Sequence, residues 1–220
     1  MFDTTNRPQT FTCHNGAKAA LPFTQSEYED RITGLRAIMA KHDLDAVLLT
    51  SMHNVAYYSG FLYCSFGRPY GLVVNHNSCT TVSANIDGGQ PWRRGHCDNV
   101  IYTDWERNNY WRAVASLIGR GRRIGVEGDH LTLVARSTLD NFIDGATLID
   151  IAPDTMQARM VKSPAEIALI REGARIADVG GYAIRDAIAA GAREIDIAMA
   201  GRDAMELEIA RSFPDSKIRD

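Results

Sequence analysis

The stretch TQSEYEDRITGLRAIMAKHDLDAVLLT, residues 24–50, decides the fold. It opens with Thr24 and Glu27 at the spacing of a capping box, which marks the start of a helix. Apolar side chains then recur on one helical face, and this pattern predicts a helix that ends near His42. The run AVLLT at 46–50 lacks polar alternation, as is typical of a strand covered on both faces. A helix followed by a buried strand predicts an α/β domain.

Short apolar runs continue to alternate with helical patterns after residue 50. Further strands are predicted at 71–74, 80–84, 99–102, 123–127 and 147–151, and helices near 106–118 and 130–142. The short polar turn at 75–78 predicts a hairpin, whose two strands must be antiparallel. We therefore expect residues 1–151 to form one domain, with a mixed sheet flanked by helices.

A second unit is predicted over residues 152–220. The phrase SPAE at 163–166 combines an N-cap serine, a first-turn proline and a capping-box glutamate, so a long helix is expected from there to about Ala190, with Gly191 just past its end. Small residues in this helix predict close approach to another element: Ala177, Gly180 and Gly181. A second helix is expected at 194–211. Two amphipathic helices alone leave apolar faces without a partner, so we expect them to be the first helices of an incomplete α+β domain.

The composition excludes several classes of protein. The chain has 220 residues, 45% hydrophobic residues and a formal net charge of -3, without a basic stripe, so a nucleic-acid partner is not expected. No apolar run approaches the roughly 18 residues of a membrane span, and residues 1–16 lack the pattern of a signal peptide. A cytoplasmic location is therefore expected. The cysteines are predicted to be reduced thiols, because they are few and form no C-x-x-C pair: Cys13, Cys64, Cys79 and Cys97.

Aromatic, glycine and arginine residues are concentrated in three segments with the character of loops. These are YYSGFLYCSFGRPY at 57–70, SANIDGGQPWRR at 83–94 and YTDWERNNYW at 102–111. Such composition is typical of a binding surface, and the cluster Trp92, Arg93 and Arg94 is interpreted as a dimer interface in preference to an anion site. No two histidines have the spacing of metal ligands, so neither a metal nor another cofactor is expected.

These three segments, together with RRIGVEGDH at 122–130 and MVKSPAEIALIREGARIADVGG at 160–181, resemble the creatinases of the creatinase/prolidase superfamily. The resemblance implies an N-terminal α/β domain followed by the start of a catalytic "pita-bread" domain, in a homodimer. It also implies hydrolysis of creatine to sarcosine and urea without a metal, with the catalytic residues beyond position 220. Within this chain it assigns substrate contacts to Phe66 and Arg68, which would reach the active site of the partner subunit.

The chemistry of creatine is compatible with this assignment. Creatine carries a carboxylate, which suits the bidentate fork of Arg68, and a flat guanidinium cation, which suits the face of Phe66. The simpler interpretation is a surface salt bridge for Arg68 and a core position for Phe66. Cys64 lies two residues from Phe66 and is interpreted as a small buried residue, not as a nucleophile.

Two other function classes stay open. One is a metal-dependent Xaa-Pro dipeptidase or aminopeptidase of the same superfamily, whose metal ligands would also lie outside these residues. The other is a dimerising domain without catalytic activity. Only the match around Phe66 and Arg68 argues against the peptidase.

Overall fold

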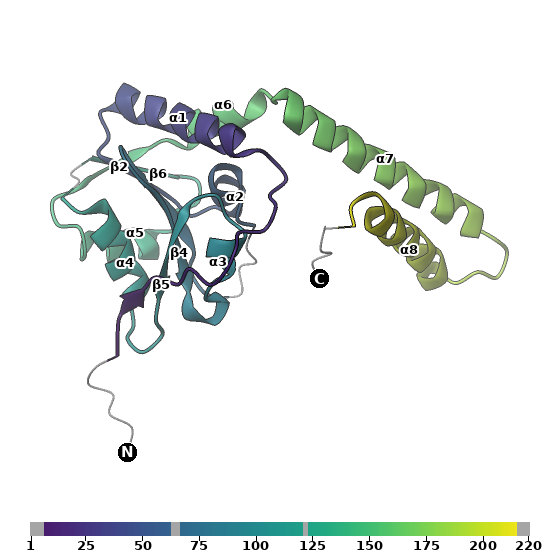
Figure 1. Cartoon of the computed structure of the whole chain (residues 1–220), viewed down its shortest axis with the longest axis horizontal. Helices are drawn as coiled ribbons and strands as arrows, with labels where there is room; N and C mark the ends of the chain where they lie inside the picture. The colour runs from purple at the N-terminus through teal and green to yellow at the C-terminus, as the bar shows by residue number, and fades with distance from the viewer. Residues whose placement is uncertain (1–6, 63–66, 121–122, 215–220) are drawn as a thin grey trace, which may run out of the picture. The chain divides into compact units, whose positions relative to one another are not determined.

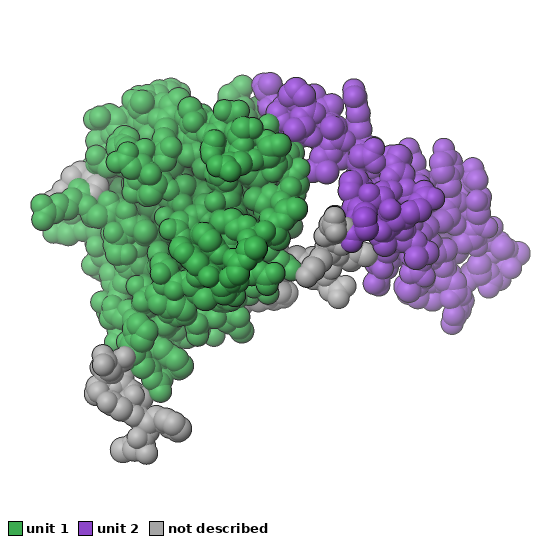
Figure 2. Space-filling model, viewed as in Figure 1, with its two compact units in different colours: residues 1–160 green, residues 161–220 purple. Residues whose placement is uncertain are grey.

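The computed structural model describes residues 7–62, 67–120 and 123–214. The chain divides into two compact units, Met1–Met160 and Val161–Asp220, which Figure 2 shows in different colours. The first unit is built around a sheet, and the described part of the second contains a pair of helices. The mixed α/β fold expected from the sequence is thereby confirmed.

A mixed sheet of seven strands forms the centre of the described part of the first unit, in the order β1-β5-β4-β3-β2-β6-β7. The strands are β1 (Thr10–Phe11), β2 (Ala46–Leu49), β3 (Gly71–Asn75), β4 (Cys79–Ala84), β5 (Asp98–Tyr102), β6 (Arg123–Val126) and β7 (Thr147–Asp150). The predicted hairpin is present, since β3 and β4 are antiparallel and the amide of Asn75 donates to the carbonyl of Ser78 at 3.1 Å. By contrast, β4 pairs with β5, and β2 with β6, in parallel.

Helices cover both faces of this sheet (Figure 1). They are α1 (Gln25–His42), α2 (Met52–Ser59), α3 (Gln90–Arg93), α4 (Asn109–Ile118), α5 (Leu133–Asp140) and α6 (Ala152–Met160), with a short 3-10 turn at Asn85–Asp87. Alternate side chains of β2 enter opposite cores. Val47 and Leu49 pack with residues of α1 and α2, whereas Ala46 and Leu48 pack with residues of α4 and α5. This explains why the sequence of β2 is apolar throughout.

Helix α2 corrects one prediction, because residues 57–59 belong to a helix and not to a loop. Its N-cap is Ser51, whose hydroxyl accepts a hydrogen bond from the amide of Asn54. The helix ends at Gly60, which has a φ of 75° and adopts the left-handed conformation that favours glycine. Among the described residues of this segment, only 60–62 and 67–70 lie outside a helix or strand.

A buried carboxylate connects the end of β6 to the start of α2. The side chain of Glu127 accepts hydrogen bonds from the amides of Thr50 and Ser51 at 2.5 and 2.8 Å, and from Nδ2 of Asn54 at 2.6 Å. It also accepts from the hydroxyl of Ser51. A helix N-terminus carries unpaired amides and a partial positive charge. This carboxylate therefore stabilises the start of α2 and the position of α2 beside the end of β6.

A second polar cluster joins α1 to α6. Lys41 Nζ lies 2.6 Å and His42 Nε2 lies 2.8 Å from the carboxylate of Asp154, in the first turn of α6. The hydrogen bond from Lys41, followed by that from His42, holds the pKa of Asp154 below its usual range, although burial acts in the opposite direction. The folded state therefore prefers the ionised carboxylate.

We expect Asp154→Asn to reduce stability at neutral pH by at most about 1 kcal/mol, because water screens a pair at the surface. A carboxyl group with a depressed folded pKa stabilises the protein above its unfolded pKa, and this contribution is lost as the pH falls through the folded pKa. Urea unfolding at pH 7 and at about pH 3 should thus show a difference between the two proteins that shrinks in acid. A difference independent of pH would contradict this assignment.

The second unit contains α7 (Pro164–Ala187) and α8 (Glu194–Ser212). The predicted capping box is confirmed, because Ser163 and Glu166 each bond to the other's backbone amide at 3.1 and 2.8 Å. Close approach is confirmed for Gly180, where an added methyl group would lie 2.6 Å from the Met205 side chain; none of this crowding occurs at Gly181. None of the helices in the described ranges is long and apolar enough to cross a membrane.

Candidate functional site

Arg68 lies on the loop between α2 and β3, one residue after Gly67, whose φ is 74°. Nη1 of Arg68 donates to Oδ1 of Asp104 at 2.8 Å. About half of the Arg68 side chain is exposed (48%), so the guanidinium, which pairs with Asp104 in the described part of the chain, remains accessible. Phe66, the other predicted substrate contact, lies outside the described residues, as does Cys64.

The backbone that follows Arg68 is fixed by two tyrosines. Tyr102, at the end of β5, donates its hydroxyl to the carbonyl of Pro69 at 3.0 Å. Tyr110, in the first turn of α4, donates to the carbonyl of Tyr70 at 3.1 Å. The rings of Tyr102 and Tyr110 pack edge to face, with centroids 5.6 Å apart, and burial raises the pKa of Tyr102. The Tyr102 hydroxyl therefore stays protonated and acts as a donor at neutral pH.

Two of the three aromatic segments thus meet in space. Between them lies an open hollow of about 330 Å³, lined among others by Arg68, Asp104, Arg107 and Trp111. A neighbouring hollow of about 300 Å³ is lined in part by Trp105. The guanidinium carbon of Arg7 lies 4.1 Å from the centroid of the Trp105 ring. The sequence analysis expected all three aromatic segments to form a binding surface. The structure brings 67–69 and residues of 102–111 together, and their binding role stays a prediction.

None of the described residues that line the two hollows comes from the segment 83–94, although Ala84 of this segment pairs with Tyr102 in the sheet. Its tryptophan already contacts the chain's own N-terminal region. Trp92 stacks on His14 with centroids 3.8 Å apart and receives Lys18 Nζ 3.9 Å from its ring centroid. The same ammonium donates to the carbonyl of Gly95 at 2.8 Å. The Trp92 ring therefore serves internal packing, and the interface proposed for Trp92, Arg93 and Arg94 stays a prediction.

Several histidines likewise have structural partners. His96 stacks on Tyr28 at 5.4 Å, and burial lowers its pKa, so it is neutral at pH 7. His130 Nδ1 lies 2.9 Å from the hydroxyl of Thr50. In the described residues no cluster of three or more His, Cys, Asp or Glu side chains could hold a metal ion. The accessible guanidinium of Arg68 is chemically suited to an anion.

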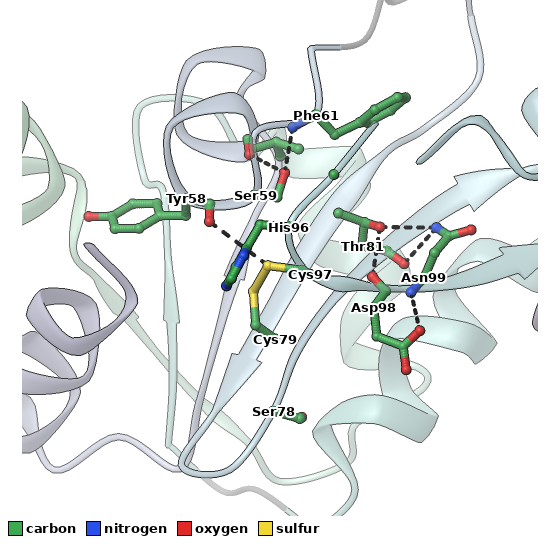
Figure 3. The surroundings of a disulfide bond; sticks show 12 residues. Tyr58, Ser59, Phe61, Ser78, Cys79, Thr81, His96, Cys97, Asp98 and Asn99 are labelled. Atoms are coloured by element: carbon green, nitrogen blue, oxygen red, sulfur yellow. Dashed lines mark hydrogen bonds between the residues drawn. A yellow bond between two sulfur atoms is a disulfide. The ribbon is translucent and has the colours of Figure 1, made fainter. Parts of the chain in front are cut away.

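The prediction that all cysteines are reduced is wrong for two of them, because Cys79 and Cys97 form a disulfide (Figure 3). The cause is the parallel pairing of β4 with β5. Its register places Thr80 beside Asp98, so the residues before them are neighbours, with Cα atoms 5.3 Å apart. Sequence spacing could not reveal this pair, since it depends on which strands are adjacent. Cys13 is a free thiol.

Loss of this disulfide should cost about 3 kcal/mol of unfolding free energy, because the bond closes a loop between residues 18 positions apart. We expect dithiothreitol to lower the urea midpoint of the wild-type chain. The double variant Cys79→Ser/Cys97→Ser should match the reduced protein and should not respond to the reductant. Equal midpoints for oxidised and reduced wild-type chains would refute a stabilising bond.

Comparisons with known proteins agree with this architecture. Residues 31–161 match the family model "Creatinase/Prolidase N-terminal domain". The creatinase of Bacillus sp. (strain B-0618) is 45% identical over 225 residues, which cover 100% of this chain and 55% of that protein. The chain thus spans about half the length of this curated relative.

Solved structures give the same fold at lower identity. The Xaa-Pro dipeptidase from Bacillus anthracis superposes with a TM-score of 0.67 and 22% identity, over 82% of this chain and 49% of that one. The prolidase from Pyrococcus horikoshii OT3 gives a TM-score of 0.68 and 18% identity, over 81% and 49%. At these identities the likeness establishes the fold alone.

Proposed function

Because this chain belongs to the creatinase/prolidase family, we propose that it forms the N-terminal part of a creatinase, which hydrolyses creatine to sarcosine and urea. One observation favours creatine hydrolysis over peptide hydrolysis: the 45% identity to a creatinase extends over the whole chain. The peptidases match with at most 22% identity among the two structures compared, and thus support only the shared fold.

In this proposal Arg68 binds the carboxylate of creatine. A guanidinium presents a planar fork of N–H donors, which matches a carboxylate better than a single ammonium does. Phe66, outside the described residues, is proposed to lie against the guanidinium end of the substrate. Both residues would act at the active site of the partner subunit in a homodimer, and they would orient the substrate and exclude water from the wrong face.

The bond-breaking chemistry is proposed to depend on residues that have no counterpart in this chain. A water molecule, deprotonated by a general base, adds to the guanidino carbon. The bond from that carbon to the methylated nitrogen then breaks, and the nitrogen takes up a proton as sarcosine leaves. The remaining fragment is urea. The proposed reaction needs no metal, which separates it from the metal-dependent peptidase alternative.

Metal dependence provides the test. The gene product at its natural length should release urea from creatine at the same rate before and after treatment with excess chelator. The 220-residue chain, as a control, should release none. Loss of activity on chelation, with cleavage of an Xaa-Pro dipeptide after manganese is restored, would favour the peptidase; no activity towards either substrate would favour a non-catalytic dimerising domain.

A cytoplasmic location also belongs to the proposal, but the disulfide between Cys79 and Cys97 opposes it. Disulfides are rare in the cytosol because thiol systems keep cysteines reduced there. Alkylation of free thiols at the moment of cell lysis would show whether Cys79 and Cys97 are oxidised or reduced in the cell. Protection of only these two cysteines would show that the bond exists in the cell.

A further inference from the structure

The contact between Arg68 and Asp104 lies beside a set of hydrogen bonds that involve Thr103. Thr103, immediately before Asp104, donates its amide to the carbonyl of Gln9 at 2.9 Å and its hydroxyl to that of Pro8 at 2.8 Å. The buried side chain of Asn109 donates Nδ2 to the carbonyl of Thr103 at 3.0 Å. The backbone immediately before Asp104 is thus held by both the N-terminal segment and the start of α4.

The arginine side chain, by contrast, depends on Asp104 for its direction. The tyrosine hydroxyls fix the backbone at residues 69 and 70, but an arginine has four rotatable side-chain bonds, and about half of this one is in solvent. Among the described residues, only Asp104 forms an ion pair with it. Such a contact contributes little to stability at an exposed site, yet it selects one rotamer family of a flexible side chain.

The hydrogen bond to Asp104 also determines which edge of the Arg68 guanidinium remains available to a ligand. Asp104 accepts from Nη1. No described residue accepts a hydrogen bond from Nε or Nη2 of Arg68, so the Nε–Nη2 edge of the planar guanidinium can take a carboxylate with two parallel hydrogen bonds. Asp104 would then neutralise part of the guanidinium charge without occupying the Nε–Nη2 edge that binds the carboxylate.

We propose that Asp104 is a positioning residue, which orients the guanidinium of Arg68 so that its Nε–Nη2 edge receives the substrate carboxylate. This inference rests on the proposed function, because it takes Arg68 as the group that binds creatine. Asp104 acts through Arg68 and does not touch the substrate. Its effect should therefore appear in substrate binding and not in the chemical step.

The test is steady-state kinetics of the natural-length gene product with creatine as substrate. Asp104→Asn should raise KM roughly tenfold and leave kcat within about twofold, since only the prior orientation of a binding group is lost. Asp104→Glu should recover part of the loss, because it restores the charge. The matched control is Asp140→Asn, which removes the partner of Arg136 in a pair of similar exposure on α5, and its KM should equal that of the wild type.

A double-mutant cycle separates positioning from general damage. Asp104→Asn should have no further effect on KM when Arg68 is already alanine. An added effect in that background, or a KM that is unchanged or lower in Asp104→Asn alone, would overturn the proposal. If instead Arg68→Ala itself leaves KM unchanged, the role of Arg68 in the proposed function fails, and Asp104 loses its target with it.

Discussion

Replacement of Arg68 with alanine is expected to raise the KM for creatine strongly, with a smaller change in kcat. A substrate carboxylate enclosed between two subunits would lose its charged partner, and such losses cost about 2 to 5 kcal/mol of binding free energy. This corresponds to roughly thirtyfold to several-thousandfold in KM. The measurement is urea release by the natural-length gene product over a range of creatine concentrations.

Two variants serve as controls for this result. Arg136→Ala removes an arginine of similar exposure, paired with Asp140 at 2.9 Å, and should leave KM unchanged. Arg68→Lys should give an intermediate KM, because an ammonium keeps the charge but lacks the planar fork. A KM for Arg68→Ala equal to that of the wild type would remove Arg68 from the substrate site.

Replacement of Glu127 with alanine is expected to lower the unfolding free energy of the first unit by about 3 to 5 kcal/mol. The substitution leaves the amides of Thr50 and Ser51 and the side chain of Asn54 without their common acceptor. All three tryptophans of the chain, at 92, 105 and 111, lie in this unit, so their fluorescence during urea denaturation reports its unfolding.

The matched control is Glu29→Ala on the exposed surface of α1. Glu29 accepts one hydrogen bond, from Gln25 at 2.7 Å, and its removal should change stability by no more than about 0.5 kcal/mol. If the unfolding free energy of Glu127→Ala equalled that of this control, the buried carboxylate would not stabilise the attachment of α2 to the sheet.

Local patterns were sufficient to predict most elements of the fold. Thr24 and Ser163 cap their helices as expected, with hydrogen bonds from the amides of Glu27 and Glu166. The apolar run of β2 was assigned correctly, because both of its faces are buried. Helix α2 was missed, since eight residues give too short a window for helical periodicity and its sequence is rich in tyrosine.

Features that depend on strand order could not be predicted. Glu127 meets Ser51 only because β6 lies beside β2, and Cys79 meets Cys97 only because β4 lies beside β5. Sequence separations of 76 and 18 residues carry no sign of either contact. The same holds for Asp104, which a sequence alone gives no reason to pair with Arg68.

The substrate contacts assigned to Phe66 and Arg68 stay predictions, but the surroundings of Arg68 are now described. The aromatic segments around Arg68 and Trp111 do line one hollow, and Tyr102 and Tyr110 explain why aromatic residues are concentrated there: their hydroxyls hold the arginine loop. The contacts of Trp92 with His14 and Lys18 were not predicted, because these partners come from an N-terminal segment whose path no local pattern reveals.

The central claim is that the protein hydrolyses the amidine bond of creatine. It is tested most directly by incubation of the natural-length gene product with creatine labelled with ¹³C at the guanidino carbon, in the presence of excess chelator, followed by NMR. The account predicts that labelled urea and unlabelled sarcosine appear in equal amounts. Labelled creatine that persists unchanged, while the same preparation supplied with manganese cleaves an Xaa-Pro dipeptide, would contradict it.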